Sequence, residues 1–145
     1  MITGGEPLLQ KKCINLMERL LNKKYSVMLE TSGSLKLRMV PKEVIKIVDF
    51  KCPASNMMDK NDWTILSDIQ RKDEIKFVIA NKKDYDWSKK MMKKHNLNKI
   101  CPILFSPVSN KIDISKLADW ILKDGLDVKL QMQLHKYIWG DKKGV

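Results

Sequence analysis

The 145-residue chain is 43% hydrophobic, which is enough apolar material for one core, so we expect a single domain over residues 1–145. No apolar run approaches the roughly 18 residues of a membrane span, which favours a cytoplasmic protein without a membrane partner. The formal net charge is +11, but the lysines are spread along the whole chain and arginine occurs only at Arg19, Arg38 and Arg71. This distribution is typical of a solvated surface and argues against nucleic acid. A basic, non-catalytic module that binds RNA or another polyanion is the alternative function.

Residues 1–9, with the sequence MITGGEPLL, are interpreted as a strand end, a ligand loop and a helix start. Gly4 and Gly5 let the backbone approach a ligand without a Cβ in the way. Glu6 adds a carboxylate that suits either a ligand ammonium or a helix N-terminus, and Pro7 fits a first helical turn, where no N–H is needed. The alternative is an ordinary turn before a helix, because four residues recur easily by chance.

The rest of the chain alternates between two kinds of segment. Apolar residues at helical spacing predict helices over 8–23, 41–45, 61–69, 84–95 and 112–122. Short apolar and β-branched runs predict strands over 25–29, 47–50, 75–80, 100–105 and 128–133. Such alternation predicts an α/β fold, a parallel sheet with flanking helices, because parallel neighbours need crossover connections.

Polar clusters follow the strands at their carboxyl ends. In chain order they are GGEP, ETSGS, DFKCPAS, FSPVS and QLHK. In parallel α/β folds this edge of the sheet binds ligands, so we expect one functional rim. The cysteines do not contribute a metal site to it, because Cys13, Cys52 and Cys101 are odd in number and far apart. We expect them to be reduced, partly buried thiols.

Several of these segments together resemble a known family. The segments are TGGEPLLQ, LETSGS, VDFKCPAS, EIKFVIANKKDYDW, LFSPV, LADWIL and LQMQLHKYIWG. Their order and spacing are similar to those of 7-carboxy-7-deazaguanine synthase, a radical S-adenosylmethionine (SAM) lyase of queuosine biosynthesis. The resemblance implies the C-terminal portion of an incomplete radical SAM (β/α) barrel, in a homodimer. It also implies conversion of 6-carboxy-5,6,7,8-tetrahydropterin to 7-carboxy-7-deazaguanine with loss of ammonia. The implied cofactors are SAM, a [4Fe–4S] cluster and Mg²⁺, with flavodoxin or ferredoxin as electron donor.

The resemblance also implies roles for individual residues. The GGEP loop would receive the SAM ammonium, residues 49–51 the ribose and carboxylate, and residues 106–109 the adenosine. The cofactor-binding residues are then Gly4, Gly5, Glu6, Asp49, Phe50, Lys51, Ser106, Pro107, Val108 and Ser109. Thr3 and His135 would contact the pterin, with Glu30 and His135 as catalytic residues.

The residues themselves leave alternatives open for these roles. Asp49 and Lys51 also fit a surface ion pair, and Glu30 fits a cap on the loop that follows it. An isolated histidine such as His135 is often structural, although Gln131 and Gln133 lie close to it in sequence, and His95 is expected at the surface.

One departure from the family pattern concerns the iron–sulfur cluster. The family binds it through a CxxxCxxC motif on a loop that precedes GGEP, whereas only Met1, Ile2 and Thr3 precede it here. Cys13, Cys52 and Cys101 do not have the spacing that cluster ligation needs. We therefore expect an N-terminally truncated chain without metal ligands, with the cluster and Mg²⁺ ligands in the missing segment, and we expect it to be inactive alone.

Overall fold

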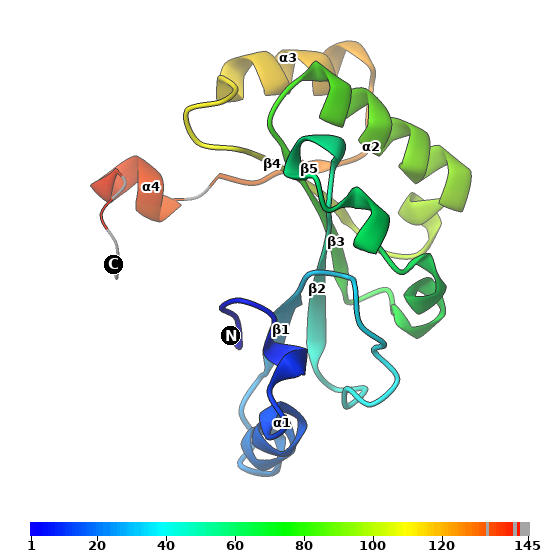
Figure 1. Ribbon diagram of the computed structural model, residues 1–145, viewed down its shortest axis with the longest axis vertical. Coiled ribbons are helices and arrows are strands. Elements are labelled where there is room, and N and C mark those ends of the chain that lie inside the picture. Colours follow the sequence, from blue (N-terminus) through cyan, green and yellow to red (C-terminus); the bar gives the residue numbers. More distant parts are fainter. Residues whose placement is uncertain (133, 141, 143–145) are drawn as a thin grey trace.

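A single parallel sheet forms the centre of the protein (Figure 1). The computed structural model describes residues 1–132, 134–140 and 142, and of residues 135–137 it describes the backbone. Five strands lie in the order β1-β2-β3-β4-β5, and every neighbouring pair is parallel. Their bounds are β1 Met28–Thr31, β2 Ile45–Phe50, β3 Glu74–Ile79, β4 Ile103–Pro107 and β5 Lys129–Leu130. The predicted α/β class with a parallel sheet and flanking helices is confirmed.

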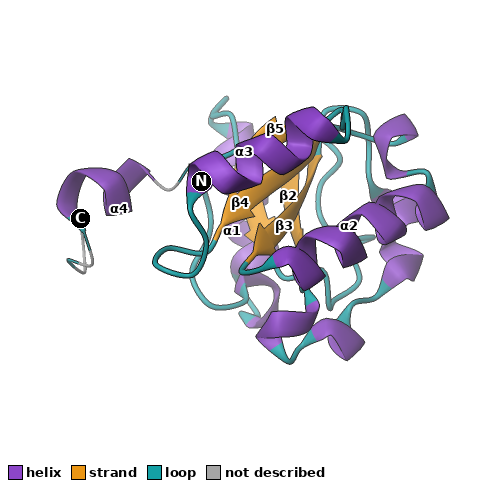
Figure 2. Cartoon of the chain, turned by 90° about the horizontal axis from the view of Figure 1, so that it is seen from above, coloured by secondary structure: helices purple, strands orange, loops and turns teal. Residues whose placement is uncertain are grey.

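Helices between the strands cover the sheet, whereas α4 follows the last strand and stands apart from the sheet (Figures 1 and 2). The α-helices are α1 Cys13–Asn22, α2 Lys82–His95, α3 Ile114–Lys123 and α4 Leu134–Trp139. The 3₁₀ helices are η1 Pro7–Leu9, η2 Pro53–Ser55, η3 Met58–Lys60, η4 Trp63–Asp68 and η5 Leu97–Lys99. Parallel strands in sequence order, joined by crossovers of one hand, bring the intervening helices to the same face. Among the described residues, no helix is both long and apolar enough to cross a membrane.

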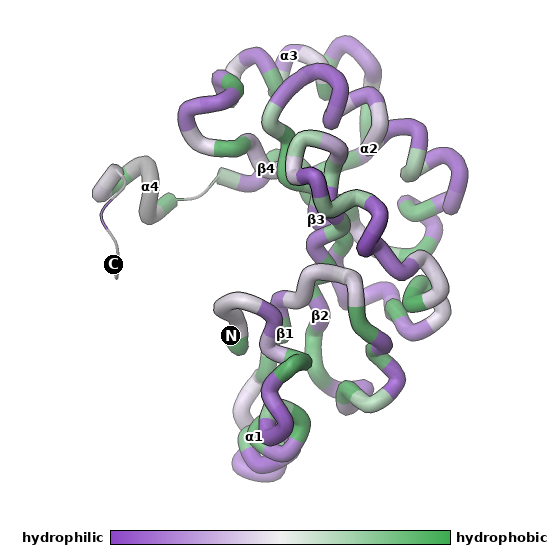
Figure 3. The backbone as a smooth tube through the Cα atoms, in the orientation of Figure 1, coloured by the Kyte–Doolittle hydropathy of each residue, from purple (hydrophilic) through white to green (hydrophobic). Residues whose placement is uncertain are grey.

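The two faces of the sheet differ because side chains alternate along each strand. Leu29, Val48, Phe77 and Phe105 point to the helix-covered face and join one core with α1, α2 and α3. Figure 3 shows that α2 is largely hydrophilic, while hydrophobic residues occur along the strands. The residues that follow or precede them by one position point to the opposite face, so the parity of the strands places Glu30, Asp49, Lys76 and Ser106 together there.

Two predicted helices have other structures. The helix expected over 41–45 is a single turn, in which Val44 N–H donates to the Pro41 carbonyl at 3.1 Å, and Ile45 already begins β2. The β-branched residues favour strand, and pairing with β1 decides the outcome. The helix expected over 61–69 is the 3₁₀ helix η4, capped by the Asp62 side chain, which accepts from Thr64 N–H at 3.1 Å.

Other element boundaries also move. The helix expected over 8–23 divides into η1 and α1, with α1 beginning at Cys13. The strand expected over 25–29 lies at 28–31, the strand expected over 100–105 lies at 103–107, and the last strand is only two residues long. In each case pairing with a neighbouring strand fixes the limits, which a local pattern does not contain.

His95 and the cysteines are placed by packing. His95 was expected at the surface, but its ring stacks on Trp63 with centroids 4.4 Å apart and planes 6° apart. Its Nε2 is buried and has no hydrogen-bond partner among the described residues. All three cysteines are free thiols and are buried, whereas the sequence predicted partial burial.

Candidate functional site

The GGEP loop lies at the carboxyl end of β1 because Ile2, two residues before the loop, pairs with that strand. Ile2 N–H donates to the Met28 carbonyl at 2.7 Å, and Glu30 N–H donates to the Ile2 carbonyl at 2.9 Å. Gly4 and Gly5 then turn the chain with φ of +101° and +59°, and no atom lies within 4 Å of the Cβ position of either. The predicted strand end, loop and helix start are confirmed, and the loop backbone is open to a ligand.

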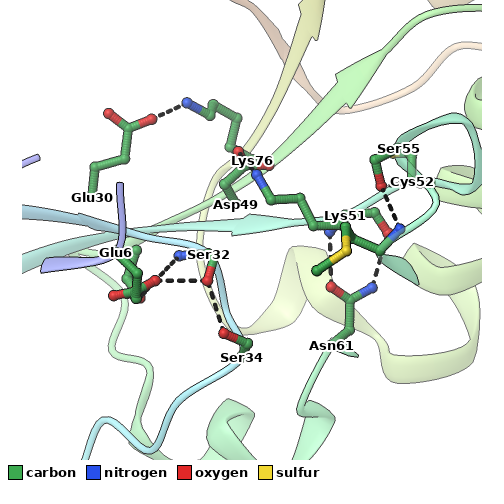
Figure 4. Close-up of polar contacts among 12 residues, drawn as sticks. Glu6, Glu30, Ser32, Ser34, Asp49, Lys51, Cys52, Ser55, Asn61 and Lys76 are labelled. Carbon is green, nitrogen blue, oxygen red and sulfur yellow. Dashed lines mark hydrogen bonds and ion pairs between the residues drawn. The ribbon is translucent and has the colours of Figure 1, made fainter. Parts of the chain in front are cut away.

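Glu6 has its carboxylate turned into the protein (Figure 4). It accepts from Ser32 N–H at 2.7 Å, from Ser32 Oγ at 2.6 Å, from Thr31 Oγ1 at 3.0 Å and from Leu8 N–H at 3.1 Å. Burial raises the pKa of Glu6, but these hydrogen bonds outweigh it and hold the pKa below its ordinary value. The sequence suggested either a ligand ammonium or a helix N-terminus as the partner of Glu6. In the structure the carboxylate contacts the N-terminus of η1 and also the 31–34 loop.

Glu30 points across the sheet, away from the loop that it was thought to cap. It forms an ion pair with Lys76 of β3 and accepts from Thr3 Oγ1 at 3.2 Å. Burial raises the pKa of Glu30, but Lys76, Thr3 and Lys51 together hold it below its ordinary value. The structure thus brings the predicted residues Thr3 and Glu30 together. Sequence reasoning missed Lys76, although its position between Ile75 and Phe77 was the available signal.

Asp49 and Lys51 form an ion pair of 2.7 Å at the end of β2. The ion pair that the sequence allowed is therefore present, but it is partly buried, because the Asp49 side chain is 13% exposed and that of Lys51 is 33% exposed. Its Oδ1 is buried and has no hydrogen-bond partner among the described residues. Burial raises the pKa of Asp49, although Lys51 and Lys76 oppose the increase. A buried carboxylate oxygen without a donor is suited to a ligand hydroxyl.

Phe50, which was predicted to bind the cofactor, has its side chain in the core. It is fully buried, and its ring stacks on Trp63 with centroids 4.3 Å apart. The alternation of β2 turns Phe50 away from the face that carries Asp49. Only the backbone of Phe50 therefore remains as a possible ligand contact.

A cavity of about 340 Å³ lies between the ends of β2, β3 and β4. Its lining residues are Asp49, Lys51, Cys52, Ala54, Ser55, Val78, Ala80, Asp84, Val108 and Lys111. Asn61 fixes one wall, because its side chain accepts from Lys51 N–H at 2.8 Å and donates to the Lys51 carbonyl at 2.9 Å. The cavity joins two predicted groups of residues, one from β2 and one from the loop after β4.

The Asp84 carboxylate holds two walls of this cavity together. It is 1% exposed, and its two oxygens accept from Ala54 N–H and from Ala80 N–H, each at 2.9 Å. These amides belong to η2 and to the end of β3. Nothing in the sequence marked Asp84 as part of the site, because its partners lie 30 and 4 positions away.

The segment 106–109 divides between strand and loop. Ser106 and Pro107 end β4, and Ser106 is buried on the same face of the sheet as Asp49. Val108 N–H donates to the Ile79 carbonyl at 2.9 Å, and Val108 lines the cavity. Ser109 follows in the turn and is not among the lining residues.

Comparison with known proteins identifies the family. No family model matches the chain. A 7-carboxy-7-deazaguanine synthase from Koribacter versatilis is 43% identical over 159 residues, covering 99% of this chain and 70% of that protein. The chain belongs to the 7-carboxy-7-deazaguanine synthase family. A second synthase, from Chlorobaculum tepidum, is 39% identical and covers 99% of this chain and 67% of that protein. The resemblance found in the sequence is confirmed.

A solved structure supports the fold of this synthase-family chain. The crystal structure of QueE from Escherichia coli matches with a TM-score of 0.67 over 91% of this chain and 54% of that chain. The sequence identity is 22%, so the likeness concerns the fold. The sequence relatives therefore show the family, and the solved structure shows the fold.

His135, a predicted site residue, lies in a different element from the one expected. It was expected directly after the last strand, but it lies within α4, and β5 ends at Leu130. The contacts of its side chain lie outside the described residues, as does Gln133. Gln131 is exposed, and its N–H donates to the Phe105 carbonyl at 2.9 Å.

The thiols do not form a cluster site in this synthase-family chain. Within the described residues, no group of three or more His, Cys, Asp or Glu side chains could hold a metal ion. Burial raises the pKa of Cys52 and of Cys101 to about 12, which disfavours the thiolates that iron would require. These cysteines therefore do not fit the ligand set of an iron–sulfur cluster.

Proposed function

We propose that this chain supplies the SAM-binding and pterin-binding side of a 7-carboxy-7-deazaguanine synthase, a radical SAM lyase. The reaction is conversion of 6-carboxy-5,6,7,8-tetrahydropterin to 7-carboxy-7-deazaguanine with loss of ammonia. One observation carries the proposal: Thr3, next to the Ile2 bridge, lies along the same rim as Glu30, Asp49, Lys51 and Val108, which come from the ends of β1, β2 and β4. Membership of the family supports the same conclusion.

SAM fits the donors and acceptors along this rim. The open backbone at Gly4 and Gly5 would receive its ammonium, and Lys51 would pair with its carboxylate. Asp49 Oδ1, buried and without a partner among the described residues, would accept from a ribose hydroxyl. Val108 would lie against the adenosine. When bound, SAM supplies the 5′-deoxyadenosyl radical that starts the rearrangement.

The iron–sulfur cluster has a different place in the proposal. The three buried cysteines do not fit it, so its ligands and that of Mg²⁺ are assigned to the part of the relatives' length that the match does not cover. The homodimer and an electron donor such as flavodoxin or ferredoxin complete the proposed assembly.

Glu30 carries the substrate side. Its pairing with Lys76 helps to hold its pKa below the ordinary value, and Thr3 orients its second oxygen. An ionised, oriented carboxylate can accept a hydrogen bond or a proton from the pterin ring. His135 is proposed as a second pterin contact on the strength of the family resemblance, and the structure places it within α4.

Titration calorimetry with SAM tests the cofactor side. We expect the chain to bind SAM, and Asp49→Asn to weaken binding about tenfold or more, because the amide replaces one acceptor oxygen with a donor. Lys51→Met should weaken binding similarly. Lys129→Met is the matched control, because Lys129 forms an exposed pair with Glu74. If both site variants bind SAM as tightly as the control, the assignment of the pocket is wrong.

A chimera tests the reaction itself. The part of the Koribacter versatilis relative that lies outside the match would be joined to this chain, and the cluster reconstituted without oxygen. We expect 5′-deoxyadenosine and 7-carboxy-7-deazaguanine as products. His135→Ala should lower kcat/KM for the pterin about tenfold to a hundredfold without changing SAM affinity, because a polar group of the pterin would lose its hydrogen-bond partner, at a cost of about 1–3 kcal/mol. A chimera that loads the cluster and cleaves no SAM would contradict the proposal, and salt-dependent RNA binding would favour the alternative.

A further inference from the structure

Four charged side chains, two acidic and two basic, lie on the open face of the sheet at its carboxyl end. Glu30 lies on β1, Asp49 on β2 and Lys76 on β3, and Lys51 follows β2 (Figure 4). Asp49 and Lys76 are direct partners in the β2–β3 register. Glu30 is opposite Ile47, so the Lys76 side chain reaches across β2 to meet it.

Lys76 is the group between the two carboxylates. Its side chain is only 13% exposed, and its ammonium pairs with Glu30 and not with its register partner. Asp49 is left to Lys51, at 2.7 Å. The charges of each pair also affect the pKa of the carboxylate in the other pair. Lys51 lowers the pKa of Glu30, whereas Lys76 lowers and Glu30 raises the pKa of Asp49. The two ion pairs therefore form one network.

Two carboxylates on neighbouring strands repel each other unless a cation lies between them. Without the Lys76 ammonium, Glu30 would lose its only charged hydrogen-bond partner among the described residues, and Thr3 would remain as its single donor. The carboxylate would then turn towards solvent, or its pKa would rise because Lys76 no longer opposes the effect of burial. Either change would also alter the effect of the Glu30 charge on Asp49.

We propose that Lys76 is a positioning residue that couples Glu30, on the pterin side, to the Asp49–Lys51 pair on the cofactor side. The inference rests on the proposed function for the identity of the two ligands. The coupling itself does not depend on the proposed function, because it is argued from contacts between side chains of this protein. Lys76 fixes the direction and the charge of Glu30, and it sets the field in which Asp49 accepts a hydrogen bond.

The coupling is measured directly by carboxyl carbon NMR titration of Glu30 in the full chain. The groups that face Glu30 are Thr3, Lys51 and Lys76, together with the Asp49 carboxylate on the neighbouring strand. In Lys76→Met we expect the titration midpoint of the Glu30 carboxyl group to rise by about one pH unit or more. The reason is that burial, which favours the neutral acid, is no longer opposed by the Lys76 ammonium. Lys76→Arg should restore a low midpoint, and Lys129→Met should leave it unchanged. An unchanged midpoint in Lys76→Met overturns the proposal.

SAM affinity separates this inference from the proposed function. We expect Lys76→Met to weaken SAM binding about threefold to tenfold through Asp49, with recovery in Lys76→Arg. If the unmodified chain binds no SAM but Glu30 still shifts in Lys76→Met, the proposed function fails and the coupling stands. If SAM binds and Lys76→Met leaves its affinity unchanged, the link to the cofactor side is wrong. Lys76→Gln replaces Lys76→Met in both measurements if the latter does not fold.

Discussion

Asp84→Asn is the substitution that most directly tests how the cavity is held together. The change keeps the shape of the side chain and replaces one acceptor oxygen with an NH₂ group. That group would face either Ala54 N–H or Ala80 N–H, a donor opposite a donor. Because Asp84 is 1% exposed, water cannot take the place of the lost acceptor.

The cost follows from these two contacts. A hydrogen bond to a charged group contributes about 1.5–3 kcal/mol, and a buried N–H without a partner costs about 1–3 kcal/mol. The two figures describe the same broken contact, so they are not added. We expect Asp84→Asn to lower the free energy of unfolding by about 2–3 kcal/mol, and to weaken SAM binding because η2 and the end of β3 are no longer tied together.

Urea unfolding followed by tryptophan fluorescence measures this loss, with the slope of the transition as a check that the mechanism of unfolding is unchanged. Asp86→Asn is the matched control on the same helix. Asp86 is 56% exposed and pairs with Lys82 one turn away, so its loss should change stability by less than about 0.5 kcal/mol. If Asp84→Asn also stays within 0.5 kcal/mol of the unmodified chain, the carboxylate is not the tie that the geometry indicates.

Three further predictions concern packing and pH. Gly33→Ala should destabilise the fold by about 2–4 kcal/mol in urea unfolding, because φ is +68° and an added Cβ would lie 3.0 Å from Val48 Cγ1; a loss below 1 kcal/mol would contradict this. Because the pKa of Glu6 is lowered in the fold, its contribution to stability is present above its ordinary pKa and is lost as pH falls through the lowered value. Glu6→Gln should therefore lower the free energy of unfolding by about 1–3 kcal/mol at neutral pH. The variant should also lose less stability than the unmodified chain as the pH is lowered. Burial lowers the pKa of His95, with Lys94 adding to the effect, so stability should fall as pH drops below about 6.5; His95→Phe keeps the stack on Trp63 and should reduce that fall in thermal unfolding between pH 7 and pH 5.

The sequence alone determined the backbone plan of this protein. Alternating helical and strand patterns predicted a parallel α/β sheet, and the GGEP stretch predicted a strand end, an open loop and a helix start. These features are local, because spacing, glycine and proline act within a few residues of themselves. The order and spacing of the motifs also identified the family, which the relatives confirm.

Only the tertiary structure decided which side chains meet. Lys76 reaches Glu30 across an intervening strand, Asp84 joins two distant amides, and Glu6 is turned to the 31–34 loop. His95 stacks on Trp63, although a lysine-rich helix had suggested the surface. Such pairings depend on strand register and on the packing of helices against the sheet, which join residues tens of positions apart. A local pattern fixes the face on which a residue lies, but register and packing fix the partner that it finds there.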